Sequence, residues 1–353
     1  MGLGRREFDV DAMTPASLGF AMPAEWEPHE RTLMAWPCRK ELWGDAVRLQ
    51  RARAAHTRLA RAINEVEPVM MIAHPDDASD AERQCGKNIE VRAIPIDDSW
   101  VRDSGPIFVK CGSQIAGVDW KFNAWGNKYH GFDDDDKLPE RLLAELGIRR
   151  FAAPLVLEGG SIAVDGAGSL ITTEECLPNP NRNPGLMRAD IEKALTDYFG
   201  VRHIIWLPYG LEDDETDGHI DNVAAFAPPG LVLLNWTDDE SDPNYARMRA
   251  NEKALKAAQD RIGQPLEIIK VVEPPRATGW NGRRLPLSYL NFYVANEAVF
   301  VPSFDHPFDR EAAATLGACF HTKEVVQLPM EDVVVGGGGI HCITQQQPAR
   351  GDA

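Results

Sequence analysis

One cysteine of this sequence has a setting in which it could act as a nucleophile. Cys342 comes soon after four consecutive glycines in the segment GGGGIHCITQQQ, residues 336–347. Glycines give the backbone conformations that other residues cannot adopt, and they let a ligand approach closely. The segment is therefore typical of a catalytic cysteine, although a buried structural cysteine beside a tight turn has the same pattern. We expect the other five cysteines, which lack such a setting, to be core or surface thiols.

A histidine and a carboxylate that could move protons lie in the segment GHIDN, residues 218–222. His219 and Asp221 are two residues apart, so on a strand their side chains would point to the same face. A histidine beside a carboxylate is a candidate general acid and base. A structural histidine and a pair of metal ligands are the alternatives.

Acidic residues around an indole could bind an organic cation. Trp100 lies in the segment DDSWVRDSGP, which carries Asp97, Asp98 and Asp103. An aromatic face attracts positive charge, and a carboxylate can accept two N–H bonds from one guanidinium. An arginine of the protein could equally pair with Asp103. Glu158 stands between an apolar run and two glycines, so we expect it to be partly buried and paired with a protein base or a bound cation.

Together these residue types suit the hydrolysis of a guanidinium group. Carboxylates can hold the nitrogens of this delocalised cation and orient its carbon, which a thiolate can then attack. A histidine can protonate the departing ammonia, leaving a thiouronium intermediate. The same histidine can then deprotonate the water that releases a ureido product.

The elements that position these residues recur along the chain. Helical patterns predict five helices, at 46–66, 138–147, 188–199, 244–262 and 309–318. Between them, tight pairs of β-type runs predict four hairpins, at 105–118, 160–173, 220–235 and 289–302. A polar position precedes or begins each hairpin, and a fifth lies near the C-terminus: Asp103, Glu158, His219 with Asp221, Asn291 and Cys342.

These polar positions are roughly 60 residues apart, which indicates a repeated unit of one hairpin and one helix. Such units closed into a ring would point equivalent positions at a common centre, and a generic α+β domain is the alternative. Because no linker rich in Pro, Gly or Ser divides the chain, we expect a single catalytic domain over residues 1–353. Residues 1–20 would form an N-terminal extension, and 349–353 a C-terminal tail.

Composition and charge restrict the partners. The chain has 54 acidic and 37 basic residues, with a formal net charge of -17. This charge disfavours nucleic acid and membrane surfaces and is compatible with steering a small cationic guanidine substrate. The N-terminal segment lacks the apolar region of a secretory signal, and the cysteines form no C-x-x-C pair, so we expect a cytoplasmic protein. A homo-oligomer is compatible with these features.

The sequence resembles the agmatine deiminase family, within the guanidine-modifying (pentein) superfamily. The resemblance runs from about Met22 to Pro348. Its motifs are MPAEWEPHERTLMAWP, DDSWVRDSGPIFV, KFNAWGNKY, LEGGSIAVDGAGSLITTEECL, NRNP, DETDGHIDN, LPLSYLNFY and GGGGIHCITQQQP. It implies an α/β fold, a five-bladed pseudo-symmetric propeller, with no metal and no cofactor. The implied reaction is hydrolysis of agmatine to N-carbamoylputrescine and ammonia through a covalent cysteine thiouronium intermediate, in putrescine biosynthesis.

The matching motifs also imply roles for individual residues. The resemblance makes Cys342 the nucleophile and His219 the general acid and base, and it assigns guanidinium binding to Asp103 and Asp221. Glu158 would orient His219 and hold a substrate nitrogen.

The substrate-binding candidates are Trp100 as a pocket wall, Glu215 near the far amine, and Asp97 and Gly339 as further contacts. Many family members have Asn in place of Gly339, and likewise in place of Asp217. The far end of the substrate is therefore the least defined, and a peptidylarginine or arginine deiminase is the alternative.

Two other classes of protein remain open on the sequence. One is a metal-dependent amidohydrolase with four ligands, His219, Asp221, Glu158 and His341. The chain lacks an H-x-H or H-E-x-x-H motif, which disfavours this class. The other is a non-catalytic binder of cationic peptides.

Overall fold

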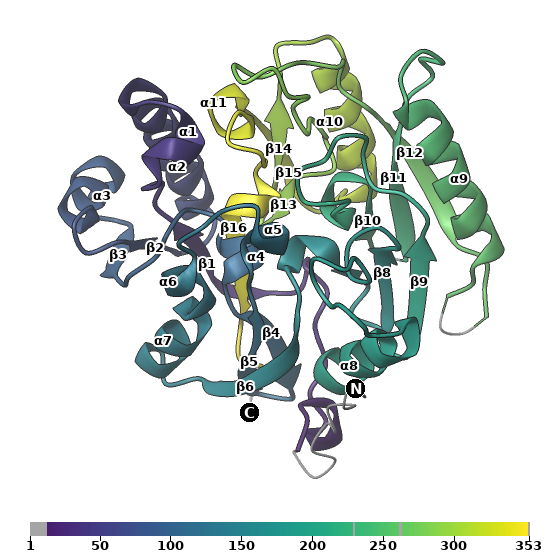
Figure 1. Ribbon diagram of the computed structural model, residues 1–353, viewed down its shortest axis with the longest axis horizontal. Coiled ribbons are helices and arrows are strands. Elements are labelled where there is room, and N and C mark those ends of the chain that lie inside the picture. The colour runs from purple at the N-terminus through teal and green to yellow at the C-terminus, as the bar shows by residue number, and fades with distance from the viewer. Residues whose placement is uncertain (1–12, 229, 261–262, 352–353) are drawn as a thin grey trace, which may run out of the picture.

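Five small sheets surround a common centre in the computed structural model, which describes residues 13–228, 230–260 and 263–351 (Figure 1). Four of these sheets repeat one unit. Each has an antiparallel hairpin, then a helical segment, then a third strand that runs parallel to the second strand of the hairpin. This arrangement confirms the predicted ring of hairpin-plus-helix repeats, and the generic α+β alternative is wrong.

The strands of the four repeats follow one another along the chain. They are β4 (Ile107–Cys111), β5 (Gln114–Lys121) and β6 (Arg149–Val156); β7 (Ala163–Val164), β8 (Ser169–Thr173) and β9 (His203–Leu207); β10 (Ala224–Ala227), β11 (Leu231–Trp236) and β12 (Glu267–Val272); and β13 (Tyr293–Val294), β14 (Ala298–Ser303) and β15 (Glu324–Pro329). Helices connect the second and third strands: α5 (Ala124–Asn127), α6 (Asp133–Asp136), α7 (Leu138–Glu145), α8 (Arg188–Phe199), α9 (Asn244–Ala257) and α10 (Phe308–Cys319). Helix α11 (Glu331–Val334) follows the last of these repeats.

The fifth sheet closes the ring by joining distant parts of the chain. Strand β16 (Thr344–Pro348) pairs antiparallel with β1 (His29–Ala35), and β2 (Val69–Ala73) and β3 (Glu90–Ala93) extend the sheet in parallel. Three helices connect these strands: α1 (Lys40–Trp43), α2 (Ala46–Asn64) and α3 (Ala78–Cys85). The hairpin of this unit is thus made from the two ends of the domain. The strand after Cys342 is held in register by residues more than 300 positions earlier.

Helix α2 shows how the sequence produces one such element. Asp45 caps it by accepting a hydrogen bond from the backbone N–H of Arg48. Leu59 and Ile63 are fully buried, as expected from the helical pattern. Val47, expected on the same apolar face, is instead 69% exposed. It lies about a third of a turn away from that face, because successive residues advance by roughly 100° around a helix.

The other predicted helices are present within a few residues of their expected bounds, except that α9 ends at Ala257. Ala258 has an extended backbone, and Gln259 forms a β-bridge to Pro265, which stops the helix. Residues 261 and 262 of that prediction lie outside the described residues. So do residues 1–12 of the expected N-terminal extension, whereas Phe20 is buried in a core cluster. Within the described ranges, no helix is both long and apolar enough to cross a membrane.

Short helical turns lead into the hairpins and meet near the centre of the ring. They are α4 (Val101–Ser104) before β4, η2 (Gly159–Ser161) before β7, η3 (Ile220–Asn222) before β10 and η4 (His341–Ile343) before β16. Helix α4 contacts both η2 and η4, and η2 contacts η3. The equivalent polar positions of the repeat are therefore brought together.

Replacing a buried side chain of the closing sheet should destabilise the domain far more than replacing an exposed one. Leu33 is fully buried and pairs with Gln345 of β16 and with Met70 of β2. We expect Leu33→Ala to lower the free energy of unfolding by about 3 kcal/mol, because it leaves a cavity. The matched change Val47→Ala should cost less than about 0.5 kcal/mol. Chemical denaturation measures both, and equal effects would contradict this packing.

Candidate active site

The structure brings together the five residues predicted to be catalytic. The short turns carry three of them, Asp103 on α4, Asp221 on η3 and Cys342 on η4. Glu158 and His219 each lie directly before a turn, at the N-terminal ends of η2 and η3. All five are buried.

His219 lies between two carboxylates. Its Nδ1 is 3.8 Å from Oδ2 of Asp103, and its Nε2 is 3.8 Å from Oε2 of Glu158. Neither ring nitrogen has a hydrogen-bond partner among the described residues, although the ring is fully buried. The imidazole is therefore placed between two negative charges and is free to exchange protons with a third group.

The glycine at position 160, two residues after Glu158, is required by the close packing of the site. A Cβ atom at Gly160 would lie 2.5 Å from Nδ1 of His219 and 3.0 Å from Oδ1 of Asp103. Its backbone N–H also donates to Oδ1 of Asp103 at 2.9 Å. A side chain at this position would force the histidine and the carboxylate apart.

Cys342 faces this group from the opposite end of the chain. Its Sγ is 3.6 Å from Oδ2 of Asp221 and accepts a hydrogen bond from Nδ2 of Asn291 at 3.3 Å. The glycine run permits the approach, since a Cβ atom at Gly338 would lie 3.0 Å from Sγ and 2.5 Å from the ring of Trp100. The predicted indole wall therefore stands directly beside the thiol.

A row of three indoles forms this wall. Trp100 stacks on Trp43, with ring centroids 5.7 Å apart, and meets Trp125 edge-on. Asp98 holds both stacked rings by accepting hydrogen bonds from their indole N–H groups. The N–H of Trp125 donates to Oδ2 of Asp103 at 2.9 Å, which fixes that carboxylate against the wall.

Glu215 lies next to the glycine run, and Gly339 is the last residue of that run. A Cβ atom at Gly337 would be 3.4 Å from Oε2 of Glu215, and the other oxygen of Glu215 accepts hydrogen bonds from Tyr129 and Arg283. A Cβ atom at Gly339 would lie 2.5 Å from Oδ1 of Asn291. Any side chain at position 339 would therefore collide with Asn291, the residue that donates a hydrogen bond to Cys342.

Asp97 is the substrate-binding candidate that the structure places elsewhere. Its Oδ2 accepts the backbone N–H groups of Asp134 and Asp135, and its Oδ1 is 3.8 Å from Arg39. These contacts hold α6, the short helix that contains Asp134 and Asp135, so Asp97 has a structural role here. The sequence grouped Asp97 with Trp100 because they are neighbours along the chain.

Sequence reasoning missed the base that partners Glu158. Arg182, with a fully buried side chain, donates from Nε to Oε1 of Glu158 at 2.7 Å. It also contacts Asp217 at 2.5 Å and donates to the backbone carbonyl of Thr216 at 2.8 Å. It thus joins Glu158 to the loop that ends at His219. The NRNP motif contains this arginine, but the sequence offered no spacing that linked it to Glu158.

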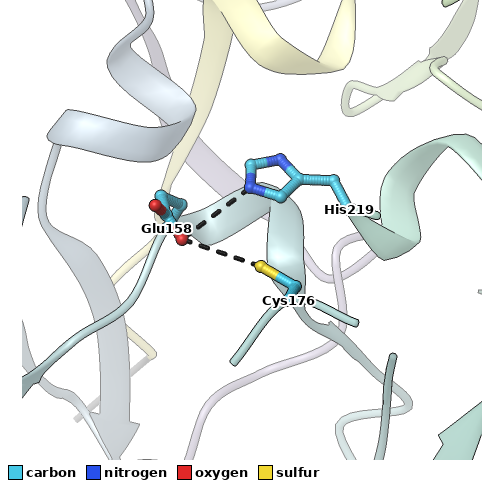
Figure 2. Close-up of side chains that lie close together, drawn as sticks. All are labelled: Glu158, Cys176 and His219. Atoms are coloured by element: carbon cyan, nitrogen blue, oxygen red, sulfur yellow. Dashed lines mark hydrogen bonds and ion pairs between the residues drawn. The ribbon is translucent and has the colours of Figure 1, made fainter. Parts of the chain in front are cut away.

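Cys176 was also missed, because it was expected to be an ordinary core or surface thiol. It is fully buried, and its Sγ lies 3.9 Å from Oε2 of Glu158. Figure 2 shows the thiol of Cys176 and the ring of His219 both directed at Glu158. All six cysteines fall within the described residues, and each is a free thiol.

His341 is occupied by protein partners. Its Nδ1 is 3.0 Å from Oδ2 of Asp221, and its Nε2 is 2.9 Å from Oε1 of Glu25. Arg102 in turn contacts Glu25 at 3.2 Å. In the described ranges, His341 does not share a metal-sized cluster with Glu158 and His219, so the four ligands of the amidohydrolase alternative do not converge.

Burial and the neighbouring charges set the proton affinities of the site. Burial raises the pKa of the Cys342 thiol well above its usual range, and the carboxylates of Asp221 and Asp103 raise it further. Burial alone would lower the pKa of His219, but Asp103, Cys176 and Glu158 outweigh it and raise that pKa well above 6.5. For Glu158, the nearby His219 and Arg182 overcome burial and lower the pKa. These shifts favour a neutral Cys342 thiol and a protonated His219 imidazole.

The sequence matches proteins of one family over almost its whole length. The model of the Porphyromonas-type peptidyl-arginine deiminase family matches residues 21–348. A protein of Legionella pneumophila is 48% identical over 337 residues, covering 95% of this chain and 96% of its own. An agmatine deiminase of Pseudomonas aeruginosa is 46% identical over 360 residues, covering 95% of this chain and 97% of its own. The chain belongs to the agmatine deiminase family.

Structures of this family have the same fold over the whole domain. The agmatine deiminase of Enterococcus faecalis superposes with a TM-score of 0.92 at 35% identity, covering 97% of this chain and 99% of its own. A substrate-bound agmatine deiminase of C. Jejuni gives a TM-score of 0.86 at 26% identity, covering 94% and 97% of the two chains. Family membership confirms the five-bladed α/β propeller and identifies a hydrolase that acts on C–N bonds.

The raised pKa of Cys342 predicts selective reactivity. A neutral reagent such as iodoacetamide should alkylate Cys342 slowly near neutral pH, because the thiolate forms only above the raised pKa. A cationic haloacetamidine of similar intrinsic reactivity should react much faster, since its positive charge favours the thiolate among the carboxylates. The measurement is the inactivation rate with each reagent as a function of pH. A thiolate that titrates well below pH 7 in the free enzyme would contradict this prediction.

Proposed function

We propose that this chain is an agmatine deiminase, which hydrolyses agmatine to N-carbamoylputrescine and ammonia. The observation that carries the proposal is the position of Asp103, Glu158 and Asp221. Asp103 and Glu158 flank the ring of His219, and Asp221 lies 3.6 Å from the sulfur of Cys342. The kinship with named agmatine deiminases supports the same activity.

Binding would place the guanidinium among the carboxylates. Asp103 and Asp221 accept hydrogen bonds from its nitrogens, and Glu158 holds the nitrogen nearest His219. Trp100 covers one face of the planar cation. These contacts leave the guanidinium carbon facing the sulfur of Cys342, which is the geometry that attack requires.

The bound cation would activate the nucleophile. In the empty site, burial and the carboxylates keep Cys342 protonated. The guanidinium brings a positive charge beside the sulfur, and this charge lowers the pKa of the thiol. The thiol therefore loses its proton as the substrate binds. The substrate thus supplies the charge that catalytic cysteines of other enzymes obtain from a permanent neighbour.

Two proton transfers by His219 would complete the reaction. The thiolate forms a bond to the guanidinium carbon, and protonated His219 gives its proton to the departing nitrogen. The C–N bond breaks and ammonia leaves. Neutral His219 then removes a proton from water, whose oxygen attacks the thiouronium carbon. The C–S bond breaks as the hydroxyl proton of the adduct passes to the departing sulfur. The neutral ureido product leaves, and Cys342 is again a thiol beside protonated His219.

The far amine of agmatine would meet acidic groups at the mouth of the site. Glu215 beside Gly337 is the proposed partner for that amine. Free arginine adds a carboxylate at this end, and the carboxylates of the site would repel it. Because the chemistry needs a free thiol, we propose that the enzyme works in the reducing cytoplasm.

The direct test is a side-by-side ureido colour assay. We expect agmatine to be the preferred substrate, with free arginine and a peptidylarginine both turned over less efficiently. The measurement is kcat/KM for the three compounds under the same conditions. A higher kcat/KM for either arginine compound would reassign the chain to an arginine or peptidylarginine deiminase.

Replacing the nucleophile should remove turnover without unfolding the protein. We expect Cys342→Ser to reduce kcat by at least about a thousandfold, because a buried hydroxyl is a far weaker nucleophile than a thiolate. Cys85→Ala is the matched control, since Cys85 is also a buried thiol but lies at the end of α3, on a different element from the site. It should retain most of its turnover. Activity above a few per cent in Cys342→Ser would refute the covalent mechanism.

Turnover should also survive prolonged chelation, because every step uses only side chains and water. We expect kcat/KM to be unchanged after dialysis against EDTA. Loss of activity that added zinc or manganese restores would instead favour a metal-dependent hydrolase.

A further inference from the structure

Three metal-binding side chains converge beside the reaction centre, and one of them has no role in the proposed reaction. Ligand atoms of Glu158, Cys176 and His219 all lie within 4.8 Å of one another (Figure 2). Oε2 of Glu158 is 3.9 Å from Sγ of Cys176 and 3.8 Å from Nε2 of His219. Among the described residues, this is the one group of three or more His, Cys, Asp or Glu side chains that is compact enough to bind one ion.

The donors of this group match a thiophilic divalent cation. One sulfur, one nitrogen and one oxygen are the ligands that zinc prefers, and tetrahedral zinc separates such atoms by about 3.3–3.6 Å. The two distances from Oε2 of Glu158 need only a small contraction. Hard cations such as Mg²⁺ would avoid the sulfur and demand more oxygens.

The surroundings leave this group open to a cation. The ring of His219 is fully buried, and its nitrogens lack hydrogen-bond partners among the described residues, so Nε2 can become a ligand. Arg182 occupies Oε1 of Glu158, which leaves Oε2 directed at Cys176 and His219. A carboxylate and a thiolate would balance the two charges of the ion.

We propose that Glu158, Cys176 and His219 form an inhibitory site for a divalent cation of the zinc type. The ion takes Oε2 of Glu158, Nε2 of His219 and the sulfur of Cys176. One proton leaves the thiol and one leaves the protonated imidazole on binding. Both Glu158 and His219 are then unavailable for the guanidinium and for proton transfer. Metal and substrate therefore exclude each other. The inhibition rests on the proposed function, whereas the binding of the ion does not.

Binding is tested on a protein that cannot use its nucleophile as a ligand. Cobalt(II) titrated into Cys342→Ser should produce a thiolate-to-cobalt charge-transfer absorption that saturates at one ion per chain. The absorption should vanish in Cys342→Ser/Cys176→Ala and persist in the matched control Cys342→Ser/Cys85→Ala. Cys342→Ser/Cys176→Ser should behave like the alanine variant, and circular dichroism checks that each variant is folded. An equal absorption without Cys176 would overturn the proposal.

Inhibition is tested with zinc and agmatine, each variant being compared with its own zinc-free rate. We expect competitive inhibition whose constant rises at least tenfold in Cys176→Ala and is unchanged in Cys85→Ala. Equal inhibition of Cys176→Ala would mean that zinc acts through Cys342, and the proposed site would be wrong. If the unsubstituted enzyme fails to turn over agmatine while Cys342→Ser still gives the cobalt absorption, the proposed function is rejected and the metal site stands. If Cys176→Ala itself lacks turnover, the cobalt titration decides.

Discussion

Buried negative charge at the centre of the ring is the constraint on which the site depends. A buried carboxylate is costly unless it is paired. Glu158 is paired with Arg182, and Asp221 contacts His341. Asp103 accepts hydrogen bonds from the neutral N–H groups of Trp125 and Gly160, and it approaches His219 only to 3.8 Å. A guanidinium would bring a further positive charge and N–H groups that match these carboxylates. The same negative charge would keep the Cys342 thiol protonated until substrate arrives. It would also favour the binding of a metal ion by Glu158, Cys176 and His219.

The ring supplies the means of concentrating these charges. Each sheet begins with a short turn or loop near the centre, and each of these segments delivers one or two polar residues there. The carboxylates, the histidine and the cysteine come from four units, and Asn291 of the remaining unit hydrogen-bonds to the sulfur. Because β16 pairs with β1, the turn that carries Cys342 is anchored by the N-terminal part of the domain. The glycines at 160 and 338 then remove the side chains that would keep these groups apart.

The sequence was sufficient to predict the repeats, four hairpins and the five central residues, because local turn signals and polar positions recur at similar spacing. It did not predict β6, β9 and β12 as strands, since each owes its place to a parallel partner that lies a helix away along the chain. Asp97 was assigned to the site by its proximity in sequence to Trp100, yet its carboxylate holds helix α6. Arg182 and Cys176 were missed for the converse reason. Their relation to Glu158 exists only after folding, across 24 and 18 residues of chain.

The claim that buried carboxylates recognise the guanidinium is tested most directly by binding without turnover. Isothermal titration of agmatine into Cys342→Ser measures that affinity, and Asp103→Asn in the same background removes one charge while keeping the shape. The account predicts that Asp103→Asn weakens binding by about 30-fold or more, because a hydrogen bond to a charged group contributes roughly 2 kcal/mol. Asp97→Asn, a matched change outside the site, should leave the dissociation constant within about twofold. Equal affinity of the Asp103→Asn protein and its parent would contradict the account.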